Sequence, residues 1–479
     1  MYMIFVAWFL VGLSWNGAYS ARHDENDYVT GAADIIAGRY NAYVTAGTGT
    51  LNRPYLYPLF LSLIMLFKDY MQESWVFIPP VEFRVCASIV QGCLFVMAVS
   101  RLASTVQRFG SRFADGVRLG LLGQPFLAFL MSDLLSDTLS LIIWIYLSSV
   151  LLEIVSCKRM LNSRGHVLMF GIGALLGALV VTRSANMPAA LFGLLIISIC
   201  TCGQLLVMFV YEASDVPRLK RLAAAAVTSV TALCIGFALA IVPQALVMAD
   251  RFSSGGASGQ FWGAGSAATA YGLTMLKYSS SVSDCAGVVP AAVPYGNPFG
   301  VSELELVWIQ QGVMGLVLYY AVNPLYALLH VFNGINYDFP TTYIMSWNLY
   351  SNRVFNLVSA MILAVAVAGA VVRGNAGLGV IPHLDRRYGF GLVVVSCCVG
   401  VSALQLTIIS VENRYGVVLW SWLSAWSGIV LTSVVAPASV WRRVYFAIVC
   451  GMLVVGILLL SEWVLAQSSI VSKAYILGC

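Results

Sequence analysis

Apolar runs of about 20 residues recur along most of the chain, and they restrict its possible folds more than any other feature. A helix of this length and character crosses the hydrocarbon core of a bilayer with its backbone groups satisfied internally. Hydrophobic residues make up 60% of the 479 residues and charged residues 10%, a balance outside the range of soluble domains. The sequence therefore predicts an all-α polytopic membrane protein.

We expect about eleven membrane-spanning helices. They cover residues 2–20, 81–101, 119–132, 137–155, 167–182, 187–211, 222–249, 353–372, 389–410, 415–434 and 444–465. The first run lacks the basic start of a signal peptide, so it is interpreted as a membrane helix. Two other apolar segments are interpreted as interfacial or re-entrant. Tyr55–Phe67 is too short to span, and Gly312–Phe332 carries Asn323 and Pro324 near its middle.

The distribution of basic residues supports this arrangement. With the N-terminus inside, five cytoplasmic connections hold 15 of the 26 Lys and Arg residues but only five of the 21 acidic residues, as the positive-inside rule requires. Two long outer segments result, 21–80 and 250–352, within a single membrane domain over residues 1–479. The formal net charge of +5 is modest and gives no reason to expect a nucleic-acid partner.

The first outer segment opens with a cluster of carboxylates. Asp24, Glu25, Asp27 and Asp34 lie within eleven residues. From Glu25 onward, apolar side chains recur at helical spacing, namely Tyr28, Ala32, Ile35, Ile36 and Tyr40, with Asp27, Gly31 and Asp34 on the other face. This pattern predicts an amphipathic helix along the outer membrane surface. Asp24 at its start has two compatible interpretations, an N-cap residue with Asp27 at N3 and a general base at the membrane border.

The order of these motifs resembles the start of the GT-C glycosyltransferases, most of all the protein O-mannosyltransferase and aminoarabinose transferase branch. The matching stretches are "DENDY", "GAADIIAGRYNAYV" and "NRPYLYPLFLSL", which follow the first predicted span. In that family the first Asp of an Asp-Glu pair is the proposed catalytic base. The resemblance gives this role to Asp24, with Asp27 as the alternative, and makes Glu25 the second member of the pair.

Later stretches resemble the family more weakly and add further candidates. "MSDLLSDTLSL" places Asp137, and less closely Asp133, at an outer turn where the family carries an acidic residue. "GALVVTRSANMP" resembles the family's Gly-rich helix that ends in Thr-Arg, and "VENRYGVVLW" resembles its late Glu-x-Arg-Tyr element. The resemblance thus gives Asp24, Glu25, Asp27 and Asp137 as catalytic candidates. It gives Arg53, Tyr57, Asp133, Arg183, Arg414 and Tyr415 as candidates for substrate binding.

The resemblance implies a GT-C fold and transfer of a sugar from a polyprenyl-phosphate donor. The acceptor would be a cell-envelope glycan, such as lipopolysaccharide O-antigen, or another lipid-linked glycan, on the periplasmic face of a bacterial inner membrane. No cofactor is expected. His23 beside Asp24 could hold a divalent metal, but the four His residues show no ligand spacing.

Two other functions stay open at this point. Pro125, Pro243 and Gln244 interrupt predicted spans, as happens in secondary transporters. A polysaccharide polymerase or an O-antigen ligase would also act on polyprenyl-linked sugars outside. The acidic cluster after the first span favours the transferase over both.

Overall fold

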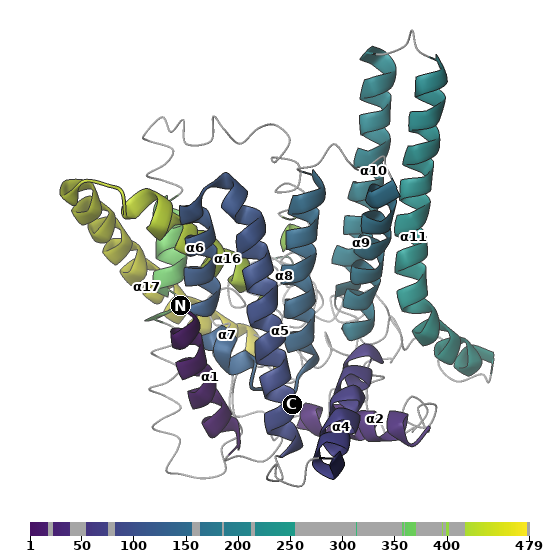
Figure 1. The fold of residues 1–479 in the computed structure, drawn as a ribbon. Helices are drawn as coiled ribbons and strands as arrows, with labels where there is room; N and C mark the ends of the chain where they lie inside the picture. The colour runs from purple at the N-terminus through teal and green to yellow at the C-terminus, as the bar shows by residue number, and fades with distance from the viewer. Residues whose placement is uncertain are drawn as a thin grey trace.

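The computed structural model is a bundle of helices, and the part of the chain that it describes contains no strand (Figure 1). It describes residues 1–17, 23–38, 54–74, 82–155, 163–183, 186–211, 216–253, 313, 357–358, 360–369, 395, 399–401 and 417–476. The α-helices are α1 (Tyr2–Gly17), α2 (His23–Ile36), α4 (Leu56–Ser74), α5 (Phe83–Val106), α6 (Ser111–Leu122), α7 (Pro125–Leu130), α8 (Ser136–Val155), α9 (Ser163–Thr182), α10 (Met187–Tyr211), α11 (Val216–Ser253), α16 (Val417–Val430) and α17 (Val440–Ile476). A 3₁₀ turn, η1 (Gln107–Phe109), follows α5, and a π-helical turn, η5 (Leu431–Val435), follows α16.

Five of the described helices contain segments that are long and apolar enough to cross a membrane. These segments are Phe83–Phe109, Ser136–Glu153, Gly165–Thr182, Lys220–Leu246 and Val440–Leu460. Shorter apolar helices lie at Tyr2–Ser14, Met187–Gly203, Ala360–Gly369 and Val417–Ser433. The protein is therefore a helical membrane protein, whereas eleven spans and a GT-C fold stay predictions.

Several predicted spans match a described helix closely, but one is wrong. The span 187–211 coincides with α10, and 137–155 begins one residue after α8 does. The span 119–132 is two helices, because α6 ends at Leu122 and α7 begins at Pro125. Proline lacks the backbone N–H that a continuous helix needs but is favoured in a first helical turn, so the chain breaks just before it. Most of 250–352 and 389–410 lies outside the described residues, whereas the structure describes 357–358 and 360–369 of the span 353–372.

The two helices after α1 lie together at one end of the bundle (Figure 1). The predicted amphipathic helix is confirmed as α2, but its buried face is only partly as expected. Tyr28 and Ala32 are buried, yet Gly31 is buried as well, and Ile36 is 42% exposed. The helix begins at His23, so Asp24 lies in its first turn rather than at the N-cap. The predicted segment Tyr55–Phe67 is the longer helix α4, whose last turns carry charged side chains.

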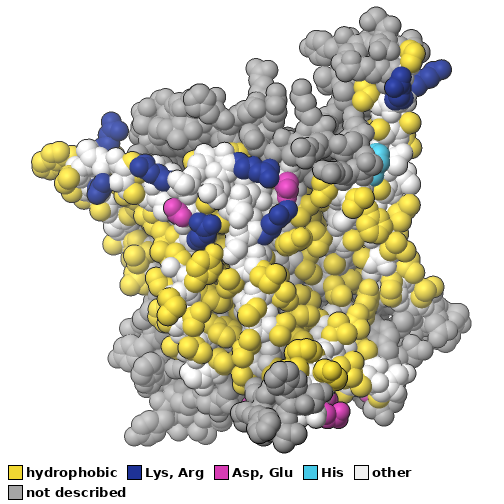
Figure 2. All heavy atoms as spheres, viewed as in Figure 1, with side chains coloured by type: hydrophobic (Ala, Val, Ile, Leu, Met, Phe, Trp, Pro, Cys, Tyr) yellow, Lys and Arg dark blue, Asp and Glu magenta, His cyan; other side chains and the backbone are white. Residues whose placement is uncertain are grey.

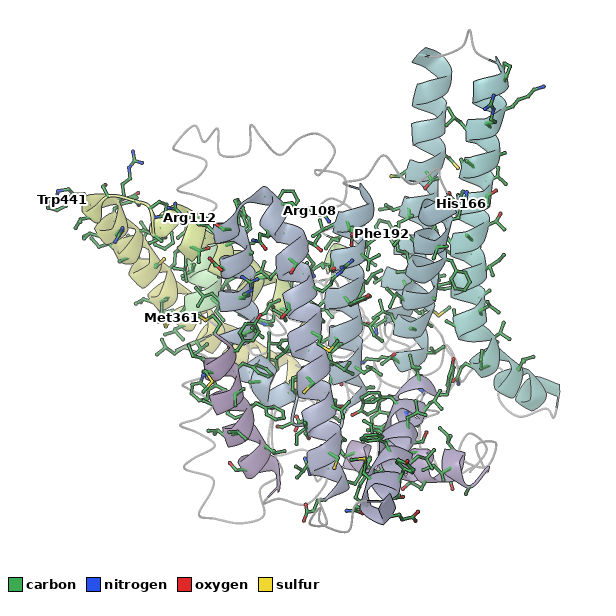
Figure 3. All side chains as sticks on the ribbon, viewed as in Figure 1. Arg108, Arg112, His166, Phe192, Met361 and Trp441 are labelled. Carbon is green, nitrogen blue, oxygen red and sulfur yellow. The ribbon has the colours of Figure 1, made fainter. Side chains whose placement is uncertain are left out.

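Basic side chains mark the opposite end of the bundle. Figure 2 shows Lys and Arg along the upper rim of the molecule, above a belt of apolar side chains. Figure 3 places Arg108, Arg112 and Trp441 at this level. We call this the basic end and the end that holds α2 and α4 the α2–α4 end. The turn between α7 and α8, residues 131–135, contacts α2 and so lies at the α2–α4 end.

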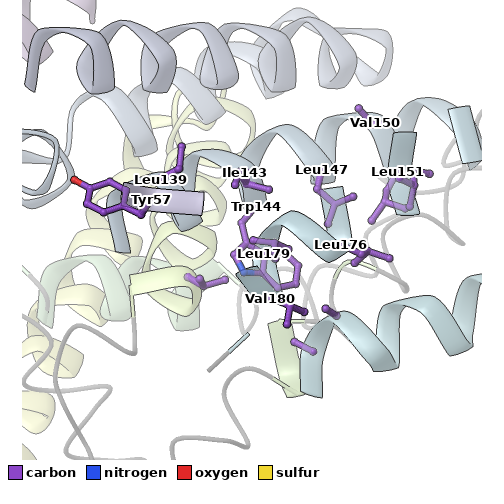
Figure 4. Close-up of a cluster of buried hydrophobic side chains, with 14 of the residues drawn as sticks. Tyr57, Leu139, Ile143, Trp144, Leu147, Val150, Leu151, Leu176, Leu179 and Val180 are labelled. Carbon is purple, nitrogen blue, oxygen red and sulfur yellow. The ribbon is translucent and has the colours of Figure 1, made fainter. Parts of the chain in front are cut away.

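The core of the bundle surrounds α8. Its membrane-spanning segment is 83% buried, whereas that of α17 is 6% buried. Trp144 and Leu147 of α8 pack in one cluster with Leu176 and Leu179 of α9 (Figure 4). Because α8 begins at the 131–135 turn and is held along its length, its first residues have a fixed position. This turn is where the sequence placed Asp133 and Asp137.

Helices α9 and α11 approach each other so closely that only glycine fits at their contact. A Cβ added to Gly173 would lie 1.9 Å from the carbonyl oxygen of Leu233, and one added to Gly236 would lie 2.1 Å from that of Phe170. The neighbouring backbone would have to move, so we expect Gly173→Ala to lower the free energy of unfolding by about 1–3 kcal/mol. Thermal unfolding of the purified protein in detergent measures the change.

Gly171 provides the matched control for Gly173, two residues away in the same helix. A Cβ at Gly171 would meet nothing within 4 Å. Alanine has the higher helix propensity, so Gly171→Ala should leave the free energy of unfolding unchanged or raise it by up to about 1 kcal/mol. Equal losses in the two variants would show that helix flexibility, and not the contact with α11, decides the effect.

Candidate functional site

Glu25 fastens α2 to the rest of the bundle. Its side chain is 1% exposed, and its Oε1 lies 3.0 Å from Nη2 of Arg84 at the start of α5. The same oxygen accepts a hydrogen bond of 3.0 Å from the backbone N–H of Leu134 in the 131–135 turn. A buried carboxylate is tolerated where a cation and hydrogen-bond donors compensate its charge. Glu25 therefore joins three segments that are far apart in the sequence.

Two tyrosines, one from "DENDY" and one from "NRPYLYPLFLSL", pack beside this ion pair. The rings of Tyr28 and Tyr57 meet edge to face, with centroids 4.9 Å apart. The Tyr28 hydroxyl is 2.8 Å from Oγ of Ser136, the first residue of α8. The Tyr57 side chain is fully buried, and its hydroxyl donates a 2.7 Å hydrogen bond to Oε1 of Gln91 on α5. Both tyrosines thus tie helices α2 and α4 to α8 and α5, which contain membrane-spanning segments.

The 131–135 turn is held by side chains from three helices. From α5, Nε2 of Gln91 donates to the carbonyl oxygens of Met131 and Asp133 at 3.1 and 3.0 Å, and Oγ of Ser88 donates to that of Ser132 at 3.1 Å. From α8, Oγ1 of Thr138 donates to the carbonyl oxygen of Asp133 at 3.4 Å, and to that of Leu130, the last residue of α7, at 3.0 Å. Glu25 of α2 contacts the turn as described above. The turn is irregular backbone in a membrane protein, and such backbone requires partners of this kind.

Asp137 and Arg183 form a second buried ion pair at the same turn. Oδ1 of Asp137 pairs with Nη1 of Arg183, and the two side chains are 4% and 15% exposed. Asp137 lies in the first turn of α8, and Arg183 follows the last residue of α9. An acid at a helix N-terminus and a base at a helix C-terminus are each favoured by the helix dipole. Both charges are therefore held at the helix ends by the fold.

Asn186 closes the site on the side of α10. Its Nδ2 donates to Oγ of Ser140 at 2.8 Å and to the carbonyl oxygen of Leu179 at 3.0 Å. Nε1 of Trp144 donates to its Oδ1 at 3.4 Å. Since these partners lie on α8 and α9, Asn186 joins the start of α10 to both helices.

The structure brings five of the sequence-predicted residues together at the α2–α4 end. Glu25, Tyr57, Asp133, Asp137 and Arg183 lie in or contact the elements around the 131–135 turn. Asp24 and Asp27 belong to the first turns of α2, although their side chains are not among those described. Arg53, Arg414 and Tyr415 lie outside the described residues.

Sequence reasoning missed Arg84 and Gln91. Each had a signal in the sequence, since Gln91 is the one amide in the apolar run "CASIVQGCLFVMAV" and Arg84 stands at the outer end of the predicted span 81–101. Polar side chains inside spans usually have a specific partner. Their partners, in α2, α4 and the 131–135 turn, could not be read from the run itself.

No group of three His, Cys, Asp or Glu side chains within the described part of the chain is arranged to hold a metal ion. The buried carboxylates of Glu25 and Asp137 each pair with an arginine and not with a metal-binding group. The side chains of His23 and Asp24, where the sequence would allow a metal, are not among those described.

Tyr57 is the described site residue with a strongly shifted pKa. Burial raises the pKa of its phenol well above 10, and the nearby Tyr28, Glu25 and Asp133 raise it further, while Arg84 partly opposes them. The hydroxyl therefore stays protonated and keeps donating to Gln91.

Because of this raised pKa, we expect the free energy of unfolding to fall at alkaline pH. The pKa is higher in the folded state than in the unfolded state, so the stabilisation is complete below about pH 10 and is lost as the pH rises further. Above pH 10 we expect the free energy of unfolding of wild type to fall more steeply than that of Tyr57→Phe. The difference in slope is at most one proton, or about 1.4 kcal/mol per pH unit. Parallel slopes in unfolding experiments between about pH 9 and 11.5 would contradict the shift.

Comparisons with known proteins do not place the chain in a family. No family model, no curated protein and no solved structure matches it. A function for the site has to be argued from its residues and their geometry.

Proposed function

We propose that the protein is a GT-C-type membrane glycosyltransferase that moves a sugar from a polyprenyl-phosphate donor to a cell-envelope glycan or another lipid-linked acceptor. The observation that carries the proposal is the meeting of two buried ion pairs, Glu25–Arg84 and Asp137–Arg183, at one turn beside the first turns of α2. Buried charges are costly in a membrane protein and usually mark a functional site. Asp24, the proposed base, is the neighbour of Glu25 in that helix.

The chemistry of sugar transfer needs the kinds of group that gather there. The acceptor hydroxyl oxygen forms a bond to the anomeric carbon, and its proton passes to a carboxylate base. The bond from the anomeric carbon to the phosphate oxygen breaks, and its electron pair stays on the polyprenyl phosphate. Arginine nearby stabilises this growing negative charge. We assign the base to Asp24 and the stabilisation of the leaving phosphate to Arg183, with Arg53 and Arg414 as further candidates.

Glu25 takes a different role in this proposal. Its carboxylate is 1% exposed and already accepts from Arg84 and Leu134, so an acceptor hydroxyl has no access to it. We infer that Glu25 holds α2 in place and that its neighbour performs the proton transfer.

We infer the orientation of the protein from its charges. The basic end holds exposed arginines such as Arg101, Arg108 and Arg112, and cytoplasmic ends of membrane proteins are enriched in such residues. The α2–α4 end then lies on the extracytoplasmic face, where a polyprenyl chain reaches the site through the bilayer and a glycan reaches it from water. For a bacterial host this is the periplasmic face of the inner membrane.

Two observations favour a secondary transporter as the second candidate. The chain breaks between α6 and α7 at Gly123–Gln124, and α11 contains Pro243. Transporters often bind substrate at broken helices. However, Oε1 of Gln244, beside Pro243, accepts a 3.0 Å hydrogen bond from the backbone N–H of Tyr55. Gln244 therefore links α11 to the residue that precedes α4. The buried ion pairs also lie at a helix end and not at either break.

The function is tested with purified protein and synthetic polyprenyl-monophosphate sugars, using lipid-linked glycans extracted from bacterial membranes as acceptors. We expect release of polyprenyl phosphate together with a labelled glycan. Turnover of polyprenyl-pyrophosphate glycans instead would identify a polymerase or ligase. Absence of transfer with every donor, combined with uptake of the labelled sugar by proteoliposomes, would overturn the proposal in favour of a transporter.

A further inference from the structure

Gln91 is a buried amide that connects α4 to the 131–135 turn. Its side chain is fully buried in α5, a helix with a membrane-spanning segment. A glutamine side chain offers two N–H donors and one carbonyl acceptor. Here Oε1 accepts a 2.7 Å hydrogen bond from the hydroxyl of Tyr57. Nε2 donates to the carbonyl oxygens of Met131 and Asp133 at 3.1 and 3.0 Å. All three functions of the amide are therefore used.

These contacts fix the direction in which the turn faces. Ser88, almost one helical turn before Gln91, donates to the carbonyl oxygen of Ser132, so three successive carbonyls of the turn accept from α5. The next N–H along the chain, that of Leu134, points instead to Glu25 on α2. The peptide planes before α8 are thus set from both sides, by α5 through their carbonyls and by α2 through an N–H.

The position of Asp137 depends on this turn. Asp137 is the second residue of α8 and pairs with Arg183, so a rotation of the preceding peptides would move its carboxylate relative to that arginine. We propose that Gln91 is a positioning residue of the transferase, which holds the 131–135 turn so that Asp133 and Asp137 keep their places in the site. This inference rests on the proposed function and adds a residue that touches neither sugar nor phosphate.

Three substitutions separate the contacts of Gln91. Gln91→Leu removes all of them, Gln91→Glu keeps an acceptor for Tyr57 but removes the N–H donors to the turn, and Tyr57→Phe leaves those donors in place. Because misplacement of catalytic groups acts mainly on the chemical step, we expect kcat to fall about tenfold or more in Gln91→Leu and Gln91→Glu, with KM for the donor changed by less than about threefold. Tyr57→Phe keeps the N–H donors to the turn, so its kcat should fall less than that of either Gln91 variant.

Gln124→Leu is the matched control. Gln124 is also buried, at the α6–α7 break, and its Nε2 contacts Oγ of Ser424 at 3.4 Å rather than the turn. We expect its kcat to stay within about twofold of wild type. All variants are assayed well below their unfolding temperatures. A Gln91→Leu protein that is less heat-stable but has wild-type kcat would overturn the inference, since a purely structural role would give that result.

Hydrogen exchange provides a readout that does not depend on the reaction. Loss of the contacts to α5 should speed exchange of the backbone amides of residues 131–138 by about tenfold in Gln91→Leu relative to Gln124→Leu. Unchanged exchange in Gln91→Leu would overturn the inference, whether or not the wild-type protein transfers sugar. If exchange is faster in Gln91→Leu but the wild-type protein transfers no sugar from any donor, Gln91 still positions the turn and the transferase function is rejected. Should Gln91→Leu not fold, Ser88→Ala, which removes only the bond to Ser132, replaces it in both experiments.

Discussion

Asp24→Asn should lower kcat for sugar transfer by about 10²- to 10⁴-fold, because an amide cannot take the proton of the acceptor hydroxyl. The substitution keeps the size of the side chain, and Asp24 lies in the first turn of α2. KM for the donor should change little, since the polyprenyl phosphate is bound elsewhere. Steady-state kinetics with a polyprenyl-phosphate sugar, together with thermal unfolding, measure both effects.

Asp34→Asn is the control for this substitution. It removes the same charge from the same helix, about three helical turns further on, and should leave kcat within about twofold of wild type. A wild-type kcat in a folded Asp24→Asn protein would contradict the assignment and point to Asp27 as the base. Equal losses in Asp24→Asn and Asp34→Asn would show that the net charge of α2 matters and not one carboxylate.

Glu25→Ala should lower the free energy of unfolding by about 3–5 kcal/mol, because it leaves the guanidinium of Arg84 without its buried partner. The N–H of Leu134 loses its acceptor at the same time, which adds to the cost of an unsatisfied buried group. Since α2 is fastened through this carboxylate, transfer activity should fall with stability. Equilibrium unfolding in mixed detergent measures the change.

Two further variants show whether burial of the charge is the cause. Glu153→Ala removes a carboxylate that pairs with Arg101 and Arg108 near the basic end, where the side chains are 26%, 46% and 45% exposed. Such a pair contributes at most about 1 kcal/mol. Glu25→Leu combined with Arg84→Leu removes both buried charges and should be more stable than Glu25→Ala, as replacement of a buried ion pair by apolar residues often is. A double variant no more stable than Glu25→Ala would contradict this explanation.

The sequence was sufficient to predict most of the described helices but not every helix end. Apolar runs located α5, α8, α9, α10 and α11 because length and hydropathy decide which segments can enter a membrane. Residues 119–132 were predicted as one span although Pro125 was recognised as an interruption, because the span was drawn from hydropathy, and the structure has two helices there. The amphipathic helix α2 was predicted from its spacing, yet Ile36 is exposed and Gly31 is buried. The spacing of apolar residues shows which side chains share one face of a helix. It does not show which of these side chains a neighbouring helix buries.

For the candidate site, the sequence by itself determined which chemical groups are present and at which end of the spans they stand. Charged residues at span ends follow from topology, so the order of the spans was enough to assign Asp133, Asp137 and Arg183 to one side of the membrane. The tertiary structure alone decided the pairing of Asp137 with Arg183, of Glu25 with Arg84, and of Gln91 with Tyr57 and the turn. The physical reason is that helices in a membrane associate through shape and individual hydrogen bonds. Such contacts join residues whose distance along the chain carries no information about their distance in space.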